Sequence, residues 1–140
     1  MLKPYKLADY QDQFQPEWAF IAAEDCLPDE VLVPYNHFFC RLARQASVYD
    51  SEDFVSCAEK DPNRNWGEQL PLALGLSVIE NETKARKYLK LPYFRQFKGI
   101  ISLDLFPADG VVKQTGIHST HYTWWRSKSF DMSNLKMLQL

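Results

Sequence analysis

The stretch that decides the fold is His118-Ser119-Thr120-His121-Tyr122-Thr123-Trp124-Trp125-Arg126. Aromatic and β-branched residues dominate positions 120–127, and these residue types favour strands. Side chains alternate along a strand, so the odd-numbered residues share one face and the even-numbered residues share the other. Both faces therefore mix a large ring with a hydrogen-bonding group. Either one tryptophan anchors the core while the other shields an edge, or the even-numbered face, with Tyr122, Trp124 and Arg126, forms an exposed aromatic platform.

Two more strands are expected just upstream. Lys98 to Phe106 alternates between apolar and polar residues, and Val111 to Thr115 is rich in β-branched types. Pro107-Ala108-Asp109-Gly110 between them is a turn signal, because proline presets φ and glycine supplies a positive φ. These patterns predict a hairpin that continues into the 120–127 strand as an antiparallel meander.

Helical patterns precede this region. The sequence predicts a helix over 28–46, with charges at its ends that suit the helix dipole, and a shorter helix from Ser51 to just before Pro62. After a loop over 62–67, a buried strand is expected over 72–79, and Asn81 is expected to cap a helix that ends before Pro92. Apolar residues before residue 27 have spacings compatible with an amphipathic helix interrupted near Pro16; they are Tyr5, Leu7, Tyr10, Phe14, Trp18 and Ile21.

These elements predict a single α+β domain over 1–140, helix-rich over 1–66 and with a strand, a helix and a meander over 70–130. We expect the amino-terminal helices to pack on a mostly antiparallel carboxy-terminal sheet. The longest nearly apolar run, Leu70 to Ile79, is about half of a membrane span, and no apolar leader segment is seen. Three irregularly spaced cysteines favour reduced thiols, so a cytoplasmic protein without a membrane partner is expected.

Charge is strongly asymmetric along the chain. Residues 1–82 hold fifteen acidic and six basic residues, whereas residues 83–140 hold three acidic and ten basic residues. The two halves could attract each other, or the basic half could contact an anionic partner. Residues 84–98 contain no acid and interleave basic with aromatic residues; the basic ones are Lys84, Arg86, Lys87, Lys90, Arg95 and Lys98. A solvated face is one interpretation of this run and a binding face is the other.

The leading hypothesis is a small binding domain for nucleic acid or for an acidic protein surface. Its predicted ligand-binding residues lie on a basic helix and on the aromatic strand; they are Lys84, Arg86, Lys87, Lys90, Arg95, Tyr122, Trp124 and Arg126. The sequence carries no motif for a cofactor or a metal, and two histidines three apart on a strand point to opposite faces.

Two alternatives stay open at this stage. One is a small enzyme acting on a nucleotide or another phosphorylated ligand, with His121 as general base, Arg126 as anion-binding group and Asp104 or Asp109 orienting the histidine. The loop at 63–67 would line its pocket. His37 and Cys40 form a less favoured pair, because their neighbours suggest a buried inert thiol. The other alternative is a structural homo-oligomer whose interface contains Leu135, Met137, Leu138 and Leu140.

Overall fold

The computed structural model describes residues 1–20 and 26–140. The strands are β1 (Leu2–Lys6), β2 (Glu30–Pro34), β3 (His37–Ala43), β4 (Leu76–Ile79), β5 (Gly99–Leu105), β6 (Gly110–Gln114), β7 (His121–Arg126) and β8 (Lys136–Met137). The α-helices are α1 (Leu7–Phe14), α2 (Cys57–Lys60), α3 (Leu70–Leu74) and α4 (Glu82–Leu89). The 3₁₀ turns are η1 (Ser51–Phe54), η2 (Gly67–Gln69), η3 (Pro92–Phe94) and η4 (Pro107–Asp109).

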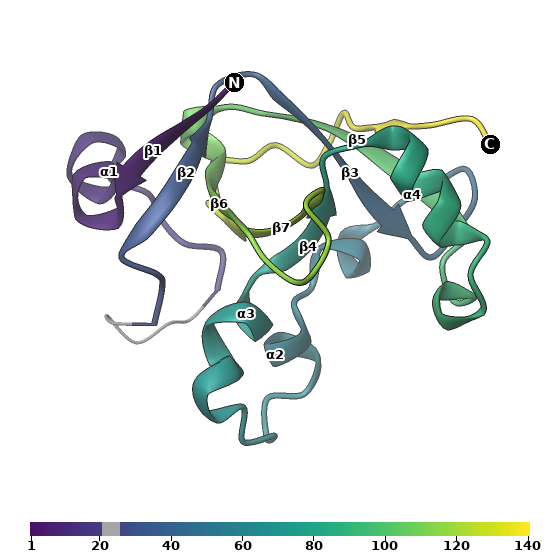
Figure 1. Cartoon of the computed structure of the whole chain (residues 1–140), viewed down its shortest axis with the longest axis horizontal. Coiled ribbons are helices and arrows are strands. Elements are labelled where there is room, and N and C mark those ends of the chain that lie inside the picture. Colours follow the sequence, from purple (N-terminus) through teal and green to yellow (C-terminus); the bar gives the residue numbers. More distant parts are fainter. Residues whose placement is uncertain (21–25) are drawn as a thin grey trace.

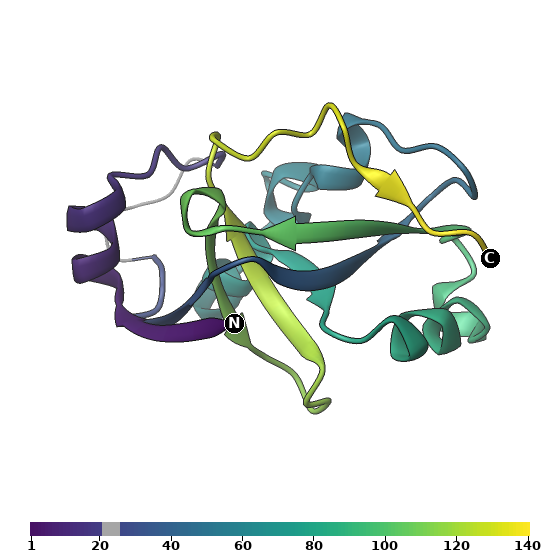
Figure 2. The ribbon, with the colours of Figure 1, turned by 90° about the horizontal axis from the view of Figure 1, so that it is seen from above.

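The eight strands form one antiparallel sheet in the order β1-β2-β6-β7-β4-β3-β5-β8. The sheet curls into an open half-barrel, with α1 at one end of the molecule and α4 at the other (Figures 1 and 2). One apolar cluster joins Leu32 of β2, Trp124 of β7 and Ile101 of β5. Because these strands come from both halves of the sheet order, this cluster lies inside the curl. The α+β class is therefore confirmed, but the arrangement of helices and sheet differs from the expected one.

Strand β7 is buried on both of its faces. It pairs with β6 and β4, and both Trp124 and Trp125 are fully buried, on opposite sides of the sheet. The Trp124 indole donates to the carbonyl of Asp109 at 3.0 Å, and the Trp125 indole donates to the carbonyl of Pro71 at 2.8 Å. Each ring thus buries its large surface while its single polar hydrogen stays paired. The strand prediction is confirmed, and both tryptophans serve the core.

The helix expected over 28–46 is wrong, because this segment forms the strands β2 and β3. Val31 and Val33 alternate with Leu32 and cover both sides of the sheet, which is the two-residue period of a strand. Asn36 takes a positive φ of 53° between the two strands, a conformation that asparagine tolerates better than most residues. The apolar positions of this segment fit a helical period as well, so the hydrophobic pattern alone does not distinguish a helix from two strands.

The expected hairpin of 98–106 with 111–115 is also wrong, although both strands exist. β5 pairs with β3 and β8, whereas β6 pairs with β7 and β2. The turn between them is present as η4, where the Asp109 carboxylate accepts from the Phe106 amide at 2.7 Å and Gly110 has a φ of 124°. The curl carries β6 away from β5, so the sheet is not a carboxy-terminal meander.

Several local predictions agree with the structure. The Asn81 side chain accepts from the Lys84 amide and caps α4, which ends before Pro92. The strand expected over 72–79 is confirmed only over β4, because residues 72–74 belong to the short helix α3. The first 14 residues form β1 and then α1 rather than one helix; Ile21 lies outside the described residues. The proposed oligomer residues Leu135, Met137 and Leu138 pack on this chain's own core.

The two edges of the sheet are β1 and β8. β1 carries Pro4, which has no amide hydrogen, between Lys3 and Lys6, and β8 contains only two residues. None of the described helices is long and apolar enough to cross a bilayer.

Gly75→Ala should destabilise the fold, because a methyl group there would overlap the Thr123 methyl group and approach the Trp125 indole at 3.3 Å. We expect a loss of about 1–3 kcal/mol in the free energy of unfolding, as for other overpacked cores. Urea denaturation measures it. Ser77→Ala, at an exposed position of β4, is the control and should change stability by less than about 0.5 kcal/mol. Equal stability of both variants would contradict the tight contact with β7.

Candidate functional site

The predicted basic helix is α4, and it exposes most of its charge. On this helix only Ala85 is buried, against a cluster formed by β3, β4 and β5. Arg86 pairs with Glu82 at 2.9 Å, one helical turn away. The other cations of the 84–98 run are exposed; they are Lys84, Lys87, Lys90, Arg95 and Lys98. The run therefore occupies the outer surface at the end of the molecule opposite α1 (Figure 2).

A row of rings follows this helix. The His118 ring lies 6.1 Å from Tyr88, Tyr88 stacks on Phe94 at 5.4 Å, and Phe94 meets the edge of Tyr93 at 5.1 Å. Tyr93 is 83% exposed. We call the whole region the basic–aromatic surface; its residues are Lys84, Lys87, Tyr88, Lys90, Tyr93, Phe94, Arg95, Lys98 and His118.

The positive charge of this surface is not balanced by the rest of the described chain. Within residues 1–20 and 26–140, no carboxylate lies within 4.0 Å of the five exposed cations. An ion pair that joins distant parts of the acidic and basic halves is Lys128 with Glu17 at 3.1 Å, well outside this surface. Direct neutralisation by the acidic half is therefore not observed among the described residues.

The aromatic strand does not join the basic–aromatic surface. Tyr122 is 8% exposed and Trp124 is fully buried inside the curl, so the exposed platform is not formed and both rings belong to the core. Arg126 lies at the far end of β7, half-buried near Glu59. Burial lowers the pKa of the Arg126 guanidinium, and the nearby Glu59 charge opposes that shift. The ring that meets α4 is instead His118, from the turn between β6 and β7.

The residues of the enzyme hypothesis lie apart. His121 and Arg126 occupy opposite ends of β7, about 17 Å along the strand. The Nδ1 atom of His121 lies 3.1 Å from the Thr115 hydroxyl and 3.0 Å from its carbonyl oxygen, so threonine rather than aspartate orients the ring. Of the two candidate aspartates, Asp109 accepts from the Phe106 amide. The loop at 63–67 does line a pocket, but His121 is not part of its lining.

Sequence reasoning missed one cluster of titratable groups. The Nε2 atom of His37 lies 2.6 Å from the Glu80 carboxylate, on the inner face of the sheet. Tyr122 lies near Glu80, and burial, reinforced by the Glu80 charge, raises the pKa of that tyrosine. Recognising β3 would have placed His37 and Cys40 on opposite faces, but only the pairing of β3, β4 and β7 brings Glu80 to His37.

Cys40 is a buried thiol, as the sequence suggested. It is fully buried against α4, and burial together with the Glu82 charge raises its pKa to about 12. Among the described residues, no group of three or more histidine, cysteine or carboxylate side chains is arranged to hold a metal ion. Comparisons with protein families, curated proteins and solved structures found no match for this chain.

The three thiols should react at very different rates with Ellman's reagent at pH 8. Cys57 is exposed and should react first, whereas Cys40 should stay protonated and protected until the protein unfolds. Because the folded-state pKa of Cys40 is raised, its contribution to stability is present below pH 9 and is lost between about pH 9 and 12. A Cys57→Ser variant serves as control and should lose the fast phase alone. Fast reaction of Cys40 in the native protein would contradict its burial.

Proposed function

We propose that this protein binds single-stranded nucleic acid through the basic–aromatic surface. The observation that carries the proposal is the placement of Tyr93, 83% exposed, among five exposed cations that have no carboxylate partner in the described chain. A protein that leaves an aromatic ring in water beside unpaired cations has surface chemistry suited to a flat, negatively charged partner.

Each part of this surface has a counterpart in a nucleic acid strand. Lysine and arginine replace the counterions of phosphates, and this release dominates binding at low salt. A protruding ring such as Tyr93 can stack on a base only where the base is not already stacked on both sides, which favours single strands. The Tyr93 ring contacts Phe94, which in turn stacks on Tyr88, so a base that stacks on Tyr93 would extend a row of rings.

The thiols agree with the cytoplasmic location that we propose for this activity. Cys26, Cys40 and Cys57 are all free, and Cys26 and Cys40 are buried in apolar surroundings. Free thiols, above all the exposed one of Cys57, are typical of a reducing compartment.

Salt dependence tests the proposal directly. If five cations each contact a phosphate of a single strand, affinity should fall about 100-fold between 50 and 200 mM salt. Fluorescence anisotropy of a labelled 20-nucleotide strand measures it, with an acidic peptide and vesicles containing phosphatidylserine as competitors. Binding without a salt slope, or stronger binding to the peptide or to the vesicles, would contradict a nucleic acid function.

The double variant Lys87→Glu, Lys90→Glu should weaken binding at least ten-fold at 100 mM salt while the unfolding temperature stays the same. Both side chains are exposed, so reversing their charge affects the partner and not the core. The matched control is Lys113→Glu with Lys136→Glu, which makes the same change of charge on exposed residues of β6 and β8. Equal effects of the two double variants would show that binding depends on the net charge of the protein and not on this surface.

Tyr93→Ala should weaken binding about ten-fold with an unchanged salt slope, because it removes stacking and leaves the phosphate contacts. Phe106→Ala is the control, since Phe106 is 48% exposed at the other end of β5. Anisotropy titrations at several salt concentrations separate affinity from slope. If the Tyr93 variant binds like the unmodified protein, the Tyr93 ring does not contact the nucleic acid.

A further inference from the structure

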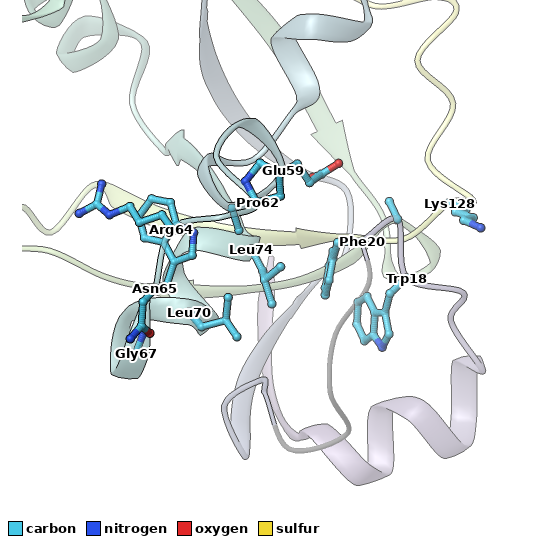
Figure 3. Close-up of a pocket in the computed structure, with 13 residues that line it drawn as sticks. Trp18, Phe20, Glu59, Pro62, Arg64, Asn65, Gly67, Leu70, Leu74 and Lys128 are labelled. Carbon is cyan, nitrogen blue, oxygen red and sulfur yellow. The ribbon is translucent and has the colours of Figure 1, made fainter.

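A pocket of about 900 Å³ lies on the other side of the molecule from the basic–aromatic surface. It is enclosed by the segment after α1, by α2 and α3 with the loop between them, and by Lys128 (Figure 3). Its volume is within the range of sites that hold small organic molecules. It is open at one side, and charged side chains stand at its rim.

The walls of this pocket are aromatic and aliphatic. Trp18 stacks on Phe20 at 5.6 Å, and Phe20 faces Leu74 and Leu70 across the pocket (Figure 3). Trp66 forms the wall beside them. Its indole hydrogen donates to the Asp61 carbonyl at 3.3 Å, so its polar atom is already satisfied and its ring remains as a contact surface.

The charge at the rim is positive on balance. Glu59 accepts from the Ser56 amide at 3.2 Å to cap α2, and it lies near Arg126. Lys128 pairs with Glu17. Arg64 lies over the Trp66 ring at 4.2 Å, and within the described residues no carboxylate comes within 4.0 Å of its guanidinium. Among the described residues, the Arg64 guanidinium at the Trp66 end of the pocket thus has no carboxylate partner.

We propose that this pocket binds a small planar aromatic molecule that carries one anionic group. The aromatic ring of this ligand occupies the space between Phe20 and the leucines Leu70 and Leu74, where contacts with these side chains replace its contacts with water. The anionic group lies at the open rim, where the Arg64 guanidinium donates hydrogen bonds to it. This site shares no residue with the basic–aromatic surface, so it does not depend on the proposed nucleic acid function.

Three probes separate the two parts of the proposal. 2-Naphthoate has both a planar ring and a carboxylate, 2-naphthalenemethanol lacks the charge, and cyclohexanecarboxylate lacks the planar ring. Indole N–H signals in a ¹H–¹⁵N spectrum report the location, since Trp18 and Trp66 line the pocket whereas Trp124 and Trp125 are buried in the sheet. We expect saturable shifts of the Trp18 and Trp66 signals with 2-naphthoate, and about ten-fold weaker binding of each of the other two probes.

Arg64→Gln should weaken 2-naphthoate about ten-fold and leave 2-naphthalenemethanol unchanged, because only the charged contact is lost. Arg95→Gln makes the same change at an exposed position outside the pocket and should leave both affinities unchanged. An unaltered fold is checked by the Trp124 and Trp125 signals. The proposal is overturned by no shift at millimolar 2-naphthoate, by shifts outside the pocket alone, or by equal affinity for the charged and neutral probes.

Discussion

The structure depends on the burial of the centre of β7, from Tyr122 to Trp125, on both faces of the sheet. Trp124 fills the inside of the curl and Trp125 fills the space beneath α3. Their indole hydrogens bond to the carbonyls of Asp109 and Pro71, so the same two rings that build the core also tie down the turn before β6 and the helix before β4. Because the four central residues of β7 are buried on both faces, they offer no surface to a ligand.

In helix α4 as well, the residues that pack on the core differ from those that face the solvent. Apart from the cap by Asn81, it is held by the burial of Ala85 and by the partly buried Tyr88 and Leu89. The apolar side of α4 therefore contributes to the core, whereas its lysines do not. Like charges at neighbouring positions of a helix cost stability on their own. In the function that we propose, an anionic partner would offset this cost by supplying the missing negative charge.

The parts of the fold that sequence could predict are those determined by neighbouring residues. The cap of α4 by Asn81, the turn at 107–110 and the composition of β7 are local, and all three agree with the structure. The strands β2 and β3 were missed because their apolar positions satisfy both a helical and a strand period. Strand order could not be predicted, since the pairing of β5 with β3 joins segments about sixty residues apart. The same holds for the candidate site. Its lysines can be recognised in the sequence as a run of basic residues, whereas the approach of His118 to Tyr88 is seen only in the folded chain.

The two edges of the open sheet matter most when many copies are crowded together. If copies gather on one nucleic acid strand, as we propose, their local concentration becomes high, and an unprotected edge strand would then pair with the edge of the next sheet. On this molecule the absent amide of Pro4 interrupts the hydrogen-bond ladder at one edge, and β8 is too short to start one at the other. Neighbouring copies can therefore touch through side chains without their sheets joining into a continuous fibre.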